Sequence, residues 1–206
     1  MPVKQRISKP YKRFYLMCKT EQYQFEELLA YHCAPTLKGY KIANMFHVSR
    51  TLFPCAEEII LEYNEKFKAK GLAFRILQAE RPRITFYLYS IDSFIKILKQ
   101  EKIRVFLERL GYPTHSPTAC LDFLEKRMEE ATYPHEIGIF LGYPLEDVLG
   151  FIQNKPCCCM GAWKVYDQNS VTRCKELFSL FEYVRNQFIR GVENGCRIEQ
   201  LMETQA

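Results

Sequence analysis

The run HCAPTLKGYK, residues 32–41, holds an imidazole, a thiol and two ammonium groups within a short stretch of chain. A thiolate acts as a nucleophile where a cation or a helix N-terminus lowers its pKa. Here apolar residues recur at helical spacing and predict a helix over 21–33, ended by Pro35. His32 and Cys33 then lie at its C-terminal end, where the helix dipole disfavours a thiolate. Three interpretations stay open for this pair: packing at a helix end, ligand binding, or a nucleophilic cysteine.

Lys41 and Asn44 follow in a segment that we expect to be short and extended or irregular. Together with the backbone amides around Gly39, they could bind an anionic group. The alternative is that both belong to a solvated loop.

A second stretch, PHEIGIF, places His135 beside Glu136 in the first turn of a helix predicted over 135–141. The positive end of the helix dipole favours a carboxylate there and disfavours an imidazolium. A neutral imidazole next to a carboxylate suits proton transfer or ligand orientation. The second histidine of the zinc signature H-E-x-x-H is absent, so we predict no metal site. Glu136 could instead interact only with free amides at the helix start.

The segment GAWKVY is predicted to be a strand over 161–166, with Lys164 and Tyr166 on one face and Trp163 on the other. Lys164 and Tyr166 could face a pocket, or Trp163 could anchor the core while both stay on the surface. The preceding cysteines, 157–159, are adjacent and cannot easily aim at one ion, so we expect a loop of oxidisable thiols.

The pattern of elements predicts an α+β fold. Two alternating apolar segments separated by Pro82 predict an antiparallel hairpin over about 72–89, which forms a small, mainly antiparallel sheet with the strand at 161–166. Capping and stop signals predict many helices covering this sheet. Their expected ranges are 21–33, 54–71, 90–100, 101–111, 116–131, 135–141, 145–153 and 168–190.

Charge divides the 206-residue chain into a basic extension, residues 1–20, and a neutral domain, residues 21–206. Residues 1–19 carry six basic side chains and no acidic one; the remaining 23 basic residues face 24 acidic ones, a net charge of −1. We expect a flexible extension and a single globular domain. No apolar run reaches the roughly 20 residues that a membrane span needs. With nine cysteines and no secretory signal pattern, we expect a cytoplasmic protein without a membrane partner.

The order of apolar helix, Leu-Gly turn and second helix over residues 137–152 is typical of a helix-turn-helix, which would suggest a DNA-binding regulator. Its second helix would carry Glu146 and Asp147 but no lysine or arginine. A helix that enters the major groove beside phosphates is not expected to be acidic. We therefore expect no nucleic-acid partner.

Three runs in this order, HCAPTLKGYKIANMF, PHEIGIFLGYPLEDVLGFI and GAWKVY, resemble a bacterial family of about this length that is common in anaerobes. The resemblance covers residues 25–190. It implies a cytoplasmic single-domain protein and lends no activity, cofactor or catalytic residue. The basic extension and the cysteines at 157–159 are where this chain departs from the family pattern.

Two functions follow as hypotheses. The first is a small-molecule or cofactor-binding protein, or an enzyme, whose anion-attracting pocket forms where the three runs converge. Its predicted ligand-binding residues are His32, Cys33, Lys41, Asn44, His135, Glu136, Lys164 and Tyr166. The second is an interaction or regulatory module that uses residues 137–152 or the basic extension. The sequence defines no particular cofactor, substrate or oligomeric state.

Overall fold

A computed structural model describes residues 9–78, 82–130 and 133–203, with side chains from Gln22 onward in the first helix. The helices are α1 (Lys9–Leu37), α2 (Ala56–Phe67), α3 (Ile91–Leu98), α4 (Glu101–Arg109), α5 (Pro117–Met128), α6 (Ile137–Phe140), α7 (Leu145–Ile152), α8 (Val171–Glu193) and α9 (Ile198–Glu203). The strands are β1 (Ala43–Ser49), β2 (Leu72–Gln78), β3 (Arg83–Ser90), β4 (Cys159–Met160) and β5 (Lys164–Val165). Short 3-10 helices precede β2 (Lys68–Lys70) and α8 (Gln168–Ser170). The predicted α+β class is confirmed.

The main sheet has the order β1-β3-β2, and both of its strand pairs are antiparallel. The predicted hairpin is therefore present as β2 and β3, and the segment after the first helix forms the third strand. Side chains alternate between the two faces, as the period of two requires. On the central strand, Phe86 packs toward α1, whereas its neighbour Tyr87 packs into the core on the opposite face.

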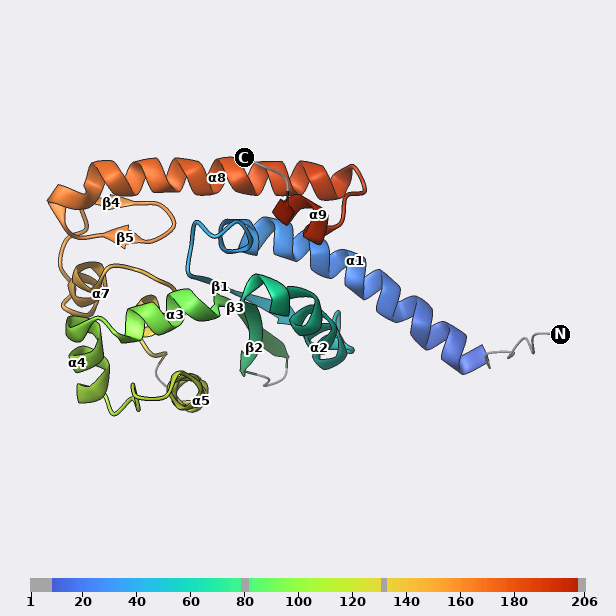
Figure 1. The fold of residues 1–206 in the computed structure, drawn as a ribbon, viewed down its shortest axis with the longest axis horizontal. Helices are drawn as coiled ribbons and strands as arrows, with labels where there is room; N and C mark the ends of the chain where they lie inside the picture. The colour runs from blue at the N-terminus through green and yellow to red at the C-terminus, as the bar shows by residue number, and fades with distance from the viewer. Residues whose placement is uncertain (1–8, 79–81, 131–132, 204–206) are drawn as a thin grey trace.

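Each face of the sheet is covered by its own group of helices (Figure 1). One core joins the sheet to α1, α2, α8 and α9, with α8 lying beside α1. The other core joins the opposite face to α3, α4, α5, α6 and α7. Segments from both ends of the chain therefore share the first core, while the middle of the chain builds the second.

Two serines that the sequence marked as helix N-caps form these caps in the structure. The Ser90 side chain accepts a hydrogen bond from the Ser93 amide at the start of α3, and Ser116 does the same for the Ala119 amide at α5. The 3-10 helix Lys68–Lys70 that follows α2 ends at Gly71, which adopts a positive φ of 66°. The two serine caps and the glycine stop could therefore be predicted from neighbouring residues alone.

Several element boundaries differ from the prediction by a few residues, and two elements differ more. The first helix is longer than 21–33: it begins at Lys9 and continues past Pro35 to Leu37. Pro35 removes one intrahelical bond near the end of the helix, and its own carbonyl accepts hydrogen bonds from the amides of Tyr40 and Lys41 in the turn that follows. The strand predicted over 161–166 is only the two-residue β5, and it pairs with β4 in a separate two-stranded sheet instead of joining the sheet of the β2–β3 hairpin. It ends early because the Tyr166 amide donates to the Asp147 carboxylate instead of a neighbouring strand.

Residues 1–8 of the basic extension lie outside the described residues, and its predicted flexibility stays a prediction. Among the helices described, none combines the length and apolar character needed to traverse a lipid bilayer.

Replacing Phe86 with alanine should lower the free energy of unfolding by about 3–5 kcal/mol, because it empties a fully buried site among aromatic rings. Urea denaturation measures this loss. Leu61→Ala, at a residue that is 68% exposed, is the control. Equal losses in the two variants would contradict this description of the first core.

Candidate functional site

A hollow of about 350 Å³ lies where the residues before α6, the α6–α7 turn, α7 and the β4–β5 hairpin meet. Five of its eleven lining residues are tyrosine, phenylalanine or tryptophan, and we call it the aromatic hollow. It is lined by Tyr133, His135, Ile137, Gly138, Tyr143, Asp147, Val148, Phe151, Trp163, Lys164 and Tyr166. The second and third of the three sequence runs therefore converge.

Asp147 joins the two halves of this hollow. It is only 3% exposed and lies in the first turn of α7, where the helix dipole favours a carboxylate. Its Oδ2 accepts a hydrogen bond from Trp163 Nε1 at 2.8 Å, and its Oδ1 accepts one from the Tyr166 amide at 2.6 Å. One buried side chain thereby holds the β4–β5 hairpin against α7.

Two glycines allow the walls of the hollow to approach closely. A Cβ at Gly150 would lie 2.4 Å from the Tyr166 ring, and one at Gly138 would lie 2.7 Å from Val148. Real Cβ atoms do not come so close, so any side chain at either position would push the walls apart.

Aromatic rings make up the wall formed by the hairpin. Trp163 stacks on Tyr143 with ring centroids 5.1 Å apart and an interplanar angle of 25°, and it meets Phe178 edge-on at 4.6 Å. Lys41 Nζ lies 5.3 Å from the centroid of the Tyr143 ring. Lys41 thus touches a ring of the hollow from the first sequence run without lining the hollow itself.

An imidazole and an ammonium group, those of His135 and Lys164, lie at the rim of the hollow. The His135 ring meets Phe151 edge-on at 5.1 Å, and Lys164 Nζ lies 5.5 Å from the centroid of the same ring. Both side chains are exposed. Of the residues singled out from the sequence, His135, Lys164 and Tyr166 are brought together here.

Glu136 lies apart from its neighbour His135 and is buried in the second core. Its Oε1 accepts hydrogen bonds from Tyr112 Oη at 2.9 Å and from Arg127 Nε at 3.0 Å and Nη2 at 2.9 Å. Its side chain makes no capping bond to α6. Glu136 therefore fixes the segment that carries His135, and its carboxylate does not face the hollow.

The remaining predicted residues lie around the junction of α1 and β1. Cys33 is fully buried, and burial raises the pKa of its thiol well above the ordinary value, which disfavours a thiolate. Burial lowers the pKa of Lys41 to about 8, an effect that a charged Cys33 would oppose. Lys41 Nζ donates to the carbonyl oxygen of Ala43 at 2.6 Å.

His32 and Asn44 both contact neighbouring side chains at this junction. The His32 ring stacks on Phe46 at 5.1 Å, and its pKa is lowered by burial and then by Arg185 and His47. Asn44 Oδ1 accepts a hydrogen bond from Thr36 Oγ1 at 2.6 Å. Neither residue lines the aromatic hollow.

Of the three adjacent cysteines, Cys157 and Cys158 precede the hairpin, whereas Cys159 lies in β4 and not in the predicted loop. Cys157 and Cys158 are exposed, and Cys158 Sγ donates to the Tyr166 carbonyl at 3.5 Å. Across the described residues, no three histidine, cysteine or acidic side chains are placed to hold a metal ion.

Tyr133, Tyr143, Asp147 and Phe151 line the hollow, and the sequence patterns do not single them out as ligand-binding residues. In the sequence, Asp147 stands out only as a negative charge on the second helix of the helix-turn-helix pattern. A usable signal is its spacing: Asp147 and Phe151 are four residues apart and therefore share a face of α7.

Substituting Asp147 with alanine should free the hairpin and expose Trp163, which is the chain's single tryptophan. Two donors lose their acceptor, at a cost of about 1–3 kcal/mol for each donor that stays buried. We expect a red shift of tryptophan emission and a lower unfolding free energy. Glu146→Ala, at the exposed neighbour, is the control; an unshifted emission in Asp147→Ala would show that this carboxylate does not position the indole.

The half-buried Lys41, whose ammonium donates to the Ala43 carbonyl, should make stability depend on pH. Its pKa is about 8 when folded against an ordinary 10.5, so between these values the unfolded chain holds a proton that the folded chain lacks. The unfolding free energy of the wild type, minus that of Lys41→Met, should therefore rise from pH 8 to pH 10. Groups common to both proteins cancel in this difference. A flat difference would mean that the ammonium is well solvated.

Comparison with known proteins gives one family and no characterised relative. No curated protein and no solved structure matches the chain. A family model described as a protein of unknown function (DUF3793) matches residues 29–202, a range that includes α6, α7 and the hairpin around the hollow. The chain therefore belongs to the DUF3793 family.

Proposed function

We propose that this protein binds a small molecule with an apolar body and an anionic group in the aromatic hollow. The observation that carries the proposal is the pairing of a ring-lined cavity with an exposed ammonium, that of Lys164, at its rim. Catalysis and a particular cofactor form no part of the proposal.

The lining supports the apolar part of the ligand. Small-molecule sites are typically concave, mainly hydrophobic and aromatic, and carry a few polar groups that fix orientation. The volume of about 350 Å³ lies near the lower end of the usual range for such sites. Aromatic side chains offer a large contact area and lose little conformational freedom when a ligand binds. The small volume of the hollow favours a compact ligand.

The charges support the anionic part. Within the described residues, the Lys164 ammonium has no carboxylate partner, so a ligand can supply one. Asp147 is the acidic residue that lines the hollow, and each of its oxygens already accepts a hydrogen bond from the hairpin. His135 adds a second donor at the rim and is suited to orient the anion.

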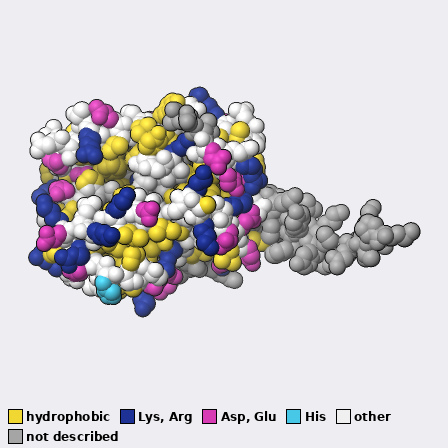
Figure 2. All heavy atoms as spheres, viewed as in Figure 1, with side chains coloured by type: hydrophobic (Ala, Val, Ile, Leu, Met, Phe, Trp, Pro, Cys, Tyr) yellow, Lys and Arg dark blue, Asp and Glu magenta, His cyan; other side chains and the backbone are white. Residues whose placement is uncertain are grey.

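The regulatory alternative draws less support. The helix that would enter DNA, α7, presents the apolar Phe151 and Ile152 to solvent, together with the exposed acid Glu146. On the face seen in Figure 2, basic and acidic side chains are interspersed among hydrophobic ones, and no continuous basic patch covers the described residues there. A cytoplasmic location remains a prediction from the sequence.

The probe 2-naphthoate tests this proposal by isothermal titration calorimetry. The wild type should bind 2-naphthoate more tightly than the isosteric, uncharged 2-naphthamide, because only the acid can pair with Lys164. Lys164→Met should weaken naphthoate binding by about fivefold, the value of an exposed ion pair, and leave naphthamide binding unchanged.

Lys175→Met, at an exposed lysine of α8, is the matched control and should bind both probes like the wild type. Failure of the wild type to bind either probe, or equal affinity for the two, would contradict the proposal.

A further inference from the structure

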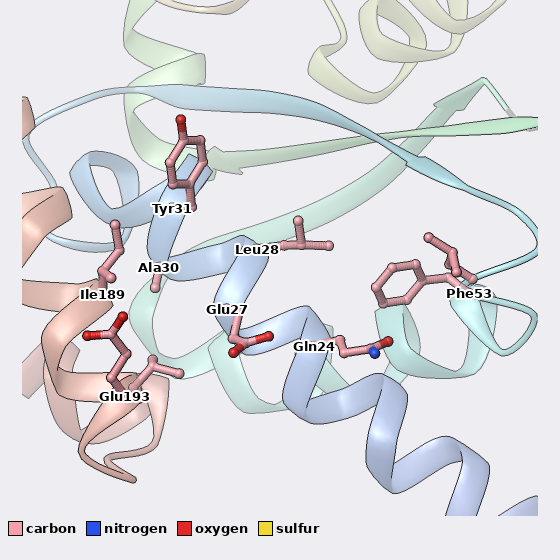
Figure 3. Close-up of a pocket in the computed structure, with 10 residues that line it drawn as sticks. Gln24, Glu27, Leu28, Ala30, Tyr31, Phe53, Ile189 and Glu193 are labelled. Carbon is pink, nitrogen blue, oxygen red and sulfur yellow. The ribbon is translucent and has the colours of Figure 1, made fainter.

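A second hollow, of about 420 Å³, lies over the exposed side of α1, where the last turns of α8 and the loop before α2 border it. Figure 3 shows Ile189 and Glu193 of α8 on one side of α1 and Phe53 of that loop on the other. We call it the α1 groove. It is lined by Gln24, Glu27, Leu28, Ala30, Tyr31, Leu52, Phe53, Ile189, Val192 and Glu193.

Much of the groove surface is apolar and part of it is open to solvent. Tyr31 is 53% exposed and Leu52 is 64% exposed, whereas the lining residues Phe53 and Val192 are buried. Aliphatic and aromatic side chains gathered in a concave surface are typical of a ligand site, and a volume above about 300 Å³ is large enough for a small molecule. The groove can therefore hold the apolar body of a ligand.

The charged side chains that line the groove are all acidic. Glu27 on α1 and Glu193 on α8 are exposed, and within the described residues neither has an ion-pair or hydrogen-bond partner. Among the described residues that line the groove there is no lysine, arginine or histidine. Two like charges that border one hollow repel each other, and a cation between them is attracted to both.

A cation already contacts an aromatic ring of the groove from outside. Arg185 Cζ lies 5.4 Å from the centroid of the Tyr31 ring, and the negative face of such a ring attracts a positive charge. Arg185 belongs to α8 but does not line the groove. In the described part of the chain it forms no ion pair with Glu27 or Glu193, so both carboxylates stay available to a ligand.

We propose that the α1 groove binds an organic cation, a small molecule that joins an apolar body to an ammonium group. The body lies against Leu28, Tyr31 and Ile189, and the ammonium group lies within reach of Glu27 and Glu193. This ligand is opposite in charge to the anion assigned to the aromatic hollow, and the two sites share no residue. A protein partner is a weaker fit, since a typical interface covers about 800 Å² on each partner, far more than one hollow with ten lining residues.

Isothermal titration calorimetry on the full-length chain tests this inference with 2-naphthylmethylamine, which is a cation at neutral pH, and the isosteric, uncharged 2-naphthylmethanol. The wild type should bind the amine more tightly than the alcohol. Glu27→Gln with Glu193→Gln should weaken amine binding by about tenfold, because two exposed ion pairs are lost, and should leave alcohol binding unchanged. Circular dichroism verifies that this variant folds.

Two matched controls locate the cation. Glu58→Gln with Glu182→Gln, at exposed acids on α2 and α8 outside the groove, should bind both probes like the wild type. Leu52→Arg places a positive charge at the groove and should weaken amine binding by about fivefold. Leu61→Arg, at a leucine of α2 that is 68% exposed, should leave amine binding unchanged.

Failure of the wild type to bind the amine, or equal affinity for amine and alcohol, would overturn the inference. A preference for the amine that survives in the groove variant would also overturn it. If an amphipathic peptide of lysine and leucine binds through Glu27 and Glu193 while the amine does not, the occupant is a protein segment and the inference is again overturned. None of these outcomes affects the aromatic hollow, which other residues form and an anionic probe tests.

Discussion

The carboxylate of Asp147 is the constraint on which the candidate site depends. The β4–β5 hairpin has two residues in each strand, and an isolated hairpin of this length is not stable in water. Its position comes from the two hydrogen bonds to Asp147 and from the packing of Trp163 against Tyr143 and Phe178. The wall that carries Lys164 is therefore fixed by α7 and α8 rather than by the main sheet.

The division of the sheet into two faces explains where the hollow forms. Phe86 and Tyr87 are adjacent, and the pleat sends them into different cores. The second core is built from short helices in the middle of the chain and continues through Ile137 and Val148 to the edge of the hollow. Tyr87 Oη also donates to the Phe140 carbonyl at 2.7 Å, which ties α6 to the central strand. His135, at the rim of the hollow, thus directly precedes α6, which packs in the second core and is bonded to the central strand.

The fold was predictable where short-range signals decide. The β2–β3 hairpin, the serine caps of α3 and α5 and the glycine after α2 each depend on a few neighbouring residues. The extent of β5 was not predictable, because Tyr166 finds its acceptor in a residue 19 positions earlier. Glu136 likewise finds Arg127 and Tyr112 through the tertiary fold, which separates it from His135 despite their adjacency.

The sequence identified residues of a suitable type for the candidate site, but it did not show which distant residues each of them contacts. Lys164, Tyr166 and His135 stood out as polar or aromatic groups at element ends, and they meet at the hollow. His32 and Asn44 stood out for the same reason, but His32 stacks on Phe46 and Asn44 accepts a hydrogen bond from Thr36. Nothing in a local pattern distinguishes these two outcomes, because the difference lies in which distant ring or hydroxyl group comes near.

A crystal structure of the protein grown with saturating 2-naphthoate tests the central claim most directly. The account predicts the naphthyl group between Phe151 and Trp163 in the aromatic hollow, with its carboxylate within ion-pair distance of Lys164 Nζ. A ligand bound at another surface, or a hollow filled only by water at saturation, would contradict it.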